Sequence, residues 1–192
     1  MSETCWQEFD DQRLVVASLL GEPRAYDELV RRYRGAVLVV AREIVGTGDE
    51  AEDVAQDALL VAFKALPQLR EPSRFGPWLH AITRRRARRL LQQGRWRRTR
   101  LDELLLSEVQ ALTEGGDETR RWMAAQEVQQ MLSCLSTEQR VVVELHYFED
   151  LPIRRIGHFL SLPETTVKWR LHAAYQVLRR TLGREEAQHG KE

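Results

Sequence analysis

Two helical segments joined by a tight turn, between residues 134 and 182, limit the fold of this chain more than any other feature. Ser136 and Gln139 have the spacing of a capping box, in which two side chains of the first helical turn cap backbone N–H groups. After this helix, apolar periodicity predicts a short helix over 153–160 and a longer one over 164–182, with a proline-containing turn between them. This order is typical of a helix-turn-helix, whose second helix lies in the major groove of DNA.

The outward face of the predicted second helix carries side chains that suit DNA. Thr165 and Thr166 lie in its first turn, where backbone N–H groups favour a phosphate, and Arg170 can reach phosphates farther along. The predicted contacts with duplex DNA are Thr165, Thr166, Lys168, Trp169, Arg170 and His172. An ordinary helical hairpin with a solvated face has the same pattern, and the pattern alone leaves the two interpretations about even.

The residues themselves favour DNA. The runs 135–157 and 162–174 closely resemble the C-terminal domain of sigma factors of the extracytoplasmic-function class, called region four. In that family region four reads the minus-thirty-five promoter element, and the resemblance implies the same role here. The sequence departs from the family at Gly157, where Ala is usual, and at Trp169, where a small Ser is usual.

The charge of the chain is balanced in total but not along its length. The 192 residues contain 29 Lys and Arg and 29 Asp and Glu, a length that suits one or two small domains. Between Arg70 and Arg100 the only acid is Glu71, whereas acids concentrate over 49–57 and 102–118. This asymmetry predicts one surface that binds a polyanion and a separate acidic surface.

Cysteine usage and the absence of long apolar runs bear on the compartment. Cys5 and Cys134 lie far apart without metal-ligand spacing, so we expect free thiols in a reducing compartment. The N-terminus has no basic flank followed by an apolar run, and no run approaches the roughly 18 residues that span a bilayer. The sequence therefore predicts a cytoplasmic protein without membrane insertion.

The remainder of the chain reads as helices, so we predict an all-α fold. Apolar residues recur at helical spacing over 9–20, 24–45, 49–66 and 77–93, and nothing resembles a strand of useful length. In the helix over 24–45, the charged residues Glu28, Arg31, Arg32 and Arg34 are expected on the solvated face. Residues 119–132 are expected to form a helix that leads into the C-terminal domain.

The helix expected over 49–66 carries the acidic surface. Carboxylates in its first turn are stabilised by the helix dipole, which explains part of the cluster but not Gln56 and Asp57, two turns in. Paired carboxylates could also serve as a catalytic acid and base, but no His, Ser or Cys partner accompanies them, so we expect no enzymatic activity. Residues 49–57 and 63–66 resemble region two of the same sigma class. In that family this region docks on the clamp coiled coil of RNA polymerase. The resemblance implies that the polymerase contacts are Asp53, Gln56, Asp57 and Leu60.

The arginine-rich helix expected over 77–93 carries the basic surface. Such a run can be a solvated face or a generic polyanion patch, but the aromatic residues beside it favour nucleic acid, because rings stack on exposed bases. Residues 73–84 resemble the part of region two that opens the minus-ten element and captures an unstacked base. The resemblance implies that the contacts are Arg74, Phe75, Trp78, Arg84, Arg85 and Arg88. Arg85 stands where the family commonly has Asn, and Arg89 where it often has Asp.

These blocks predict two small helical domains joined by a flexible linker. We place region two over 1–99, the linker over 100–118, region four over 119–183 and a polar tail over 184–192. The resemblance implies a promoter-specificity subunit without cofactor or metal. Its expected partners are core RNA polymerase, through the clamp coiled coil and the flap, and promoter DNA, and an anti-sigma factor is a further candidate. The alternative is a stand-alone helix-turn-helix regulator that needs no polymerase, and a nucleic-acid-processing enzyme is a more distant one.

Overall fold

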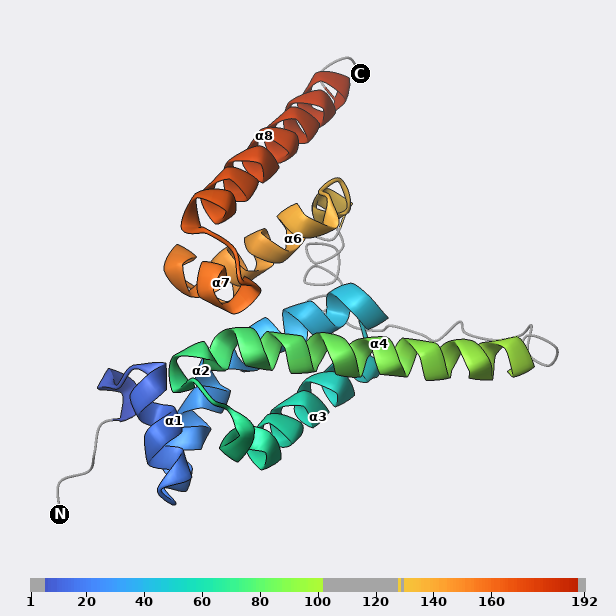
Figure 1. Ribbon diagram of the computed structural model, residues 1–192. Coiled ribbons are helices and arrows are strands. Elements are labelled where there is room, and N and C mark those ends of the chain that lie inside the picture. The colour runs from blue at the N-terminus through green and yellow to red at the C-terminus, as the bar shows by residue number, and fades with distance from the viewer. Residues whose placement is uncertain (1–5, 102–127, 129, 190–192) are drawn as a thin grey trace, which may run out of the picture.

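The N-terminal domain is a bundle of helices around α2. The computed structural model describes residues 6–101, 128 and 130–189. Every element that Figure 1 labels within these ranges is a helix. The elements of this domain are η1 (Trp6–Glu8), α1 (Asp11–Leu19), α2 (Pro23–Val45), α3 (Asp49–Ala65), η2 (Leu66–Gln68), η3 (Pro72–Arg74) and α4 (Phe75–Leu101). The four predicted helices of this domain are confirmed within two residues at most ends, but α4 continues to Leu101 rather than ending at Gln93.

Local signals explain where the helices begin and end. The Asp10 carboxylate accepts a hydrogen bond from the backbone N–H of Arg13 at 2.8 Å, which caps α1. Pro23 occupies the first turn of α2, where its missing N–H costs nothing. Gly46 and Gly48 have φ of +94° and +139°, a region that favours glycine, and they separate α2 from α3.

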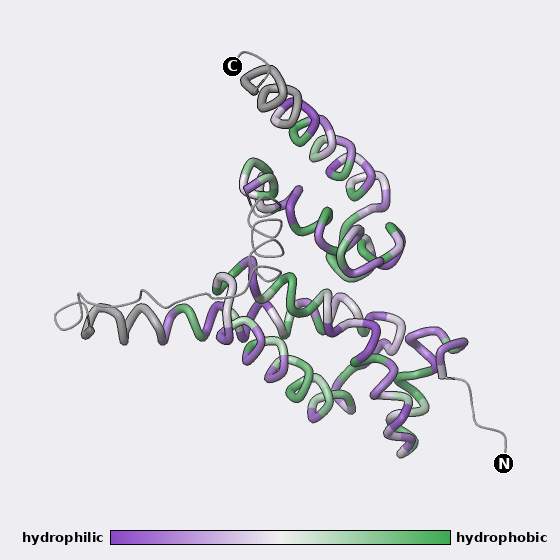
Figure 2. The backbone as a smooth tube through the Cα atoms, turned by 180° about the vertical axis from the view of Figure 1, so that it is seen from behind, coloured by the Kyte–Doolittle hydropathy of each residue, from purple (hydrophilic) through white to green (hydrophobic). Residues whose placement is uncertain are grey.

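The core of the domain lies where α2 packs against α1, α3 and α4. Tyr33 and Phe75 are among its largest fully buried side chains, and their rings lie 5.5 Å apart. Tyr26 is buried too, and its hydroxyl donates to the Leu59 carbonyl at 2.7 Å, which ties α2 to α3. Figure 2 shows hydrophilic and hydrophobic residues alternating along the helices, as expected of helices with one buried face.

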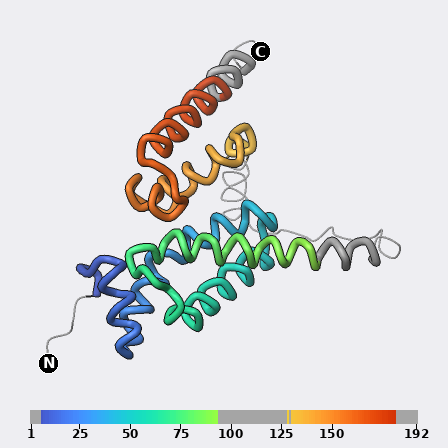
Figure 3. Tube along the Cα trace, in the orientation of Figure 1, coloured from blue at the N-terminus to red at the C-terminus, as the bar shows by residue number. Residues whose placement is uncertain are grey.

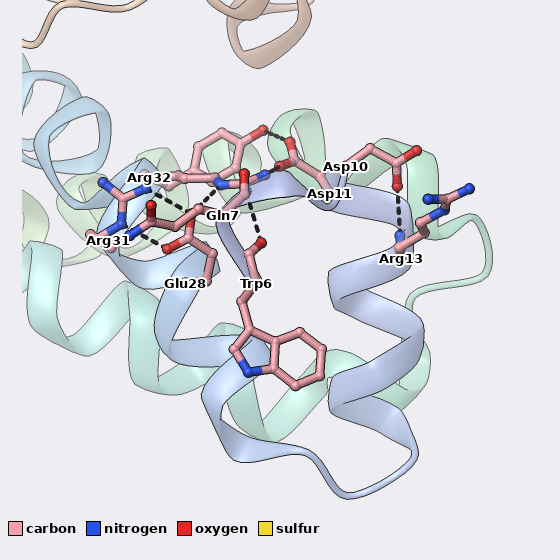
Figure 4. A network of polar contacts seen from close by, with 9 residues as sticks. Trp6, Gln7, Asp10, Asp11, Arg13, Glu28, Arg31 and Arg32 are labelled. Carbon is pink, nitrogen blue, oxygen red and sulfur yellow. Dashed lines mark hydrogen bonds and ion pairs between the residues drawn. The ribbon is translucent and has the colours of Figure 1, made fainter. Parts of the chain in front are cut away.

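A buried ion network joins α1 to α2 (Figure 4). Glu28 is only 7% exposed, and Arg32, with a side chain 5% exposed, donates to it at 2.6 Å. Arg32 also donates to Asp11 at 3.0 Å and to the Gln7 carbonyl at 2.9 Å. The sequence pattern had placed Glu28 and Arg32 on the solvated side of α2, and that prediction is wrong, because η1 and α1 cover both.

The C-terminal domain contains the predicted helix-turn-helix. Its elements are α6 (Thr137–Val143), the π-helical turn η4 (Glu144–Phe148), α7 (Ile153–Leu160) and α8 (Glu164–His189). The capping box is confirmed, since the Gln139 N–H donates to Ser136 Oγ at 3.3 Å and the Ser136 N–H to Gln139 Oε1 at 3.0 Å. Ser161 takes a left-handed conformation with φ of +59°, which turns the chain from α7 into α8.

The turn between α7 and α8 is very tight at Gly157. The Leu162 N–H donates to the Gly157 carbonyl at 2.8 Å, and a Cβ atom built on Gly157 would lie 2.8 Å from the Leu162 carbonyl oxygen. Such a contact is shorter than ordinary packing allows, so the turn as it stands needs glycine at this position.

The two domains contact each other. Phe159 of α7 is fully buried, and its ring lies 5.8 Å from Tyr33 of α2 and 5.2 Å from His80 of α4. In Figure 3 the C-terminal domain lies over α2 and α4, and α8 points away from them. Most of the predicted linker, and with it the expected flexibility, lies outside the described residues, although Arg100 still belongs to α4. Within the described ranges, no helix has the length and apolar character that crossing a membrane requires.

Candidate polymerase and promoter surfaces

The outer face of α3 combines polar groups with an apolar groove. Asp53 and Gln56 are exposed, and Leu60 keeps 52% of its surface exposed. Gln56 and Leu60 line a groove between α2 and α3 together with Tyr26, Val30, Leu59 and Phe63. Exposed apolar side chains rimmed by polar groups are typical of a protein-docking surface.

Asp57, the second predicted acidic contact, is engaged within the domain. Its carboxylate lies 2.8 Å from both Nε and Nη2 of Arg86, so the pair ties α3 to α4. The Asp57 side chain is still half exposed, which leaves its outer edge open to a partner. The structure therefore gives Asp57 a structural bond that the sequence did not reveal.

Three arginines of α4 form an exposed basic face. Arg84, Arg85 and Arg88 are exposed within about one turn of the helix, and none pairs with a carboxylate among the residues whose placement is described. They line one hollow with His80 and with Leu160 of the C-terminal domain. Burial, together with the positive charge of Arg84, lowers the pKa of His80 to about 4, so the imidazole is neutral at physiological pH.

The three residues predicted to capture a base near the start of α4, Arg74, Phe75 and Trp78, differ in how exposed they are. Arg74 is exposed and lies 3.7 Å from Glu71, and Trp78 is half-buried at the edge of a groove formed with Leu69 and Pro77. Phe75 is 1% exposed and packs 6.1 Å from Trp78. The prediction that Phe75 contacts DNA is therefore wrong for this conformation, because its ring fills the core.

The recognition helix α8 presents Trp169 outward. Successive residues turn by about 100° around a helix, so Trp169 lies opposite the buried stripe that contains Val167 and Ala174. Trp169 is 66% exposed, and Thr165, Lys168 and His172 are exposed beside it, whereas Thr166 is half-buried. A ring, a cation and two hydrogen-bonding side chains on one helical face suit the floor of a major groove.

Arg170, by contrast, faces the domain. Its side chain is 17% exposed, and its Nη2 lies 2.6 Å from Glu138 of α6. This ion pair ties α8 to α6, so Arg170 has a structural partner in addition to the phosphate contact that the sequence predicts. Arg170 lies about 100° around the helix from Trp169, on the flank of the buried stripe, and this spacing is the signal that could have indicated its role.

Among the described residues, no group of three or more His, Cys, Asp or Glu side chains is arranged to hold a metal ion.

The sequence did not predict the contact between the domains, because Phe159, Tyr33 and His80 each read as part of their own domain.

Comparison with known proteins matches both domains. Residues 29–97 match Sigma-70 region 2 and residues 125–178 match Sigma-70, region 4. The chain is 30% identical to the RNA polymerase sigma-H factor of Pseudomonas aeruginosa over 90% of this chain and 93% of that protein. It is 28% identical to the ECF RNA polymerase sigma factor SigW of Bacillus subtilis over 84% of this chain and 91% of that protein.

A solved structure has the same fold. CnrH, determined in complex with the cytosolic domain of CnrY, matches with a TM-score of 0.58 at 24% identity, over 90% of this chain and 97% of that one.

Proposed function

Because this chain belongs to the extracytoplasmic-function class of RNA polymerase sigma factors, we propose that its function of directing core polymerase to promoters is divided among three surfaces. The observation that carries this proposal is the presence, in one chain, of an exposed docking groove and two separate faces suited to nucleic acid. A stand-alone regulator would not need the first of these. The matches to both sigma regions, in the family's order, also favour the sigma factor over that alternative.

Core polymerase is assigned to the outer face of α3. Asp53 and Gln56 offer an exposed carboxylate and amide to basic groups of the clamp, and Leu60 offers apolar surface at the edge of the groove. Side chains of α2 line the opposite wall of the groove, so the groove is present in the structure as it stands. A protein that works with core polymerase is expected in the cytoplasm, and we extend the proposal to that compartment.

The opened strand is assigned to α4 and the segment before it. Arg84, Arg85 and Arg88 provide positive charge along one face, and Trp78 provides a ring near its start. Arginines bind phosphates of any sequence, and a ring adds stacking on an unpaired base. Arg74, in the segment before α4, is exposed, and we assign it to the same strand.

The upstream duplex is assigned to the first turns of α8. Lys168, Trp169 and His172 occupy the outward face, and Thr165 lies at the N-terminal end, where the helix dipole favours a phosphate. The Arg170–Glu138 pair holds this face at a fixed angle to the remainder of the domain.

The test is transcription from a promoter library with core polymerase and this protein alone. We expect run-off transcripts from a defined promoter subset, and Asp53→Lys is expected to lower both polymerase co-purification and transcript at least tenfold. Glu8→Lys is the matched control, because Glu8 is an exposed acid of η1 and so belongs neither to α3 nor to the lining of its groove. Transcription that does not depend on the added protein, or an Asp53→Lys variant indistinguishable from the control, would refute the proposal.

A further inference from the structure

One arginine of α4, Arg86, does not belong to the basic face of that helix. Arg84 and Arg88 each lie two residues away from it, which is about 200° around a helix, so both point to the opposite side. The Arg86 side chain is only 29% exposed, and its neighbours on the same side of α4, Thr83 and Ala87, are fully buried. Its place in the helix therefore directs Arg86 toward α3 and away from the basic face.

Arg86 bridges α4 and α3 through Asp57. Its Nη2 donates to Asp57 Oδ1 at 2.8 Å, and its Nε lies 2.8 Å from Oδ2. Nε is buried and has no aligned hydrogen-bond acceptor among the described residues, so the charge of the nearby carboxylate is what compensates its burial. A guanidinium held in this way stays between the two helices only while Asp57 is ionised and in place.

The two halves of α4 are anchored differently. Its first turns carry the large buried side chains Phe75 and Leu79, which pack in the main core of the domain. Farther along, the buried residue Ala87 packs in a second cluster, whose other buried members are the small residues Ala41, Ala51 and Val54. Small side chains interlock less than large ones, so the angle of α4 in this half depends more on the Arg86–Asp57 pair.

We propose that Arg86 is a positioning residue for strand capture, which through Asp57 fixes the angle between the basic face of α4 and the outer face of α3. This inference rests on the proposed function, because it takes the basic face as the site of the opened strand. Asp57 then has two roles, since its inner edge holds Arg86 while its outer edge stays open to polymerase.

The strength of the pair limits the size of the effect. An ion pair with a half-exposed carboxylate favours its bonded geometry by at most about fivefold. Loss of the pair should therefore weaken capture of the opened strand without changing the number of phosphates that are contacted. Loss of a direct phosphate contact has a different signature, because each contact contributes about 0.7 to the slope of log affinity against log salt for a single strand.

The test measures binding of a fluorescent single strand to the holoenzyme at several salt concentrations. The strand is the non-template minus-ten segment of a promoter that the library selects. Core polymerase is saturating, and its affinity for each variant is measured separately by titration. Arg86→Gln is compared with Arg88→Gln, the matched control, which removes an equal charge from the basic face of the same helix.

We expect Arg86→Gln to bind the strand about three- to fivefold more weakly than wild type, with an unchanged salt slope and unchanged affinity for core polymerase. Arg88→Gln should instead flatten the slope by about 0.7. Arg86→Lys keeps the charge but not the planar fork, so its affinity for the strand should lie between those of wild type and Arg86→Gln.

Asp57→Asn adds a test of sign. This change releases Arg86 and removes a negative charge, so it would tighten strand binding if Arg86 acted through its charge alone. If the pair positions α4, Asp57→Asn should weaken strand binding by the saturated holoenzyme, as Arg86→Gln does.

Three results overturn the assignment: a salt slope that flattens as much in Arg86→Gln as in Arg88→Gln, a strand affinity of Arg86→Gln equal to wild type whatever its melting temperature, or tighter strand binding by Asp57→Asn. If Arg86→Gln does not fold, Arg86→Lys and Asp57→Asn decide the question in the same terms. Failure of the proposed function is distinguishable from all of these, because the wild-type holoenzyme would then not bind the strand.

Discussion

The substitution Gly157→Ala tests how tightly the helix-turn-helix is built. The family usually has Ala at this position, and helix propensity alone would make Ala more stable than Gly by about 0.5–1 kcal/mol. In this chain, however, the new Cβ atom would lie 2.8 Å from the Leu162 carbonyl oxygen. The Leu162 N–H is bonded to the Gly157 carbonyl at 2.8 Å, so the turn cannot move away without straining that bond.

The two effects can be weighed against each other. Overpacking of a tight site costs about 1–3 kcal/mol, which exceeds the gain in helix propensity. We therefore expect a net loss of about 1 kcal/mol in the free energy of unfolding, or roughly 4–8 °C in the melting temperature of a small domain. The same shift would tilt α8 against α7, so affinity for the minus-thirty-five duplex should fall as well.

The assay is thermal unfolding of the full chain together with binding to a short minus-thirty-five duplex. Gly35→Ala is the matched control, because the same change in α2 meets only the end of the flexible Glu149 side chain, which can swing aside. We expect the control to melt at or above the wild-type temperature. A Gly157→Ala protein that melts as high as wild type and binds DNA equally well would refute the argument from the turn.

Three further predictions concern charge, base readout and helix positioning. Hydrogen bonds from Arg31, which has the larger effect, and from Arg32 lower the pKa of Glu28 to about 2. Glu28 therefore contributes up to about 3 kcal/mol to the free energy of unfolding. This contribution is present above pH 4.5 and is lost as pH falls toward 2. Glu28→Gln should therefore be less stable at pH 7 and show a flatter loss of stability in acid, as measured by urea unfolding at several pH values; an unchanged acid transition would count against the network. Trp169 is exposed and should contact a thymine methyl group. Replacement of thymine by deoxyuridine at one minus-thirty-five position should therefore weaken DNA binding by the wild-type protein about fourfold and leave binding by Trp169→Ser unchanged. Equal sensitivity of the two proteins at every position would exclude this contact. Arg170→Ala should lower the melting temperature and Lys168→Ala should not, because of the two only Arg170 has a partner within the domain. A lower melting temperature for Lys168→Ala and an unchanged one for Arg170→Ala would contradict this assignment.

Much of the fold followed from periodicity and capping. The capping box at Ser136 and the short helix of the helix-turn-helix appear where the sequence predicted them, because both depend on neighbouring residues. The end of α4 was missed, because an arginine-rich helix has little apolar periodicity to mark where it stops. Capping and apolar periodicity could be used on the sequence alone because neither depends on which segment packs against the helix.

The errors at the candidate sites have one physical origin. Glu28 and Phe75 were each placed on a surface by residue type or by analogy, yet each is covered by a segment distant in sequence. Asp57 was identified as exposed, and its bond to Arg86 depends on how α3 and α4 lie together. One-dimensional patterns locate an apolar stripe, but they do not show which polar residues a neighbouring helix will cover.

Footprinting of a single promoter with and without core polymerase tests the central claim most directly. The account predicts that with core polymerase this protein protects the minus-thirty-five duplex and opens the minus-ten strand on the same molecule. No change in the footprint when polymerase is added would contradict it.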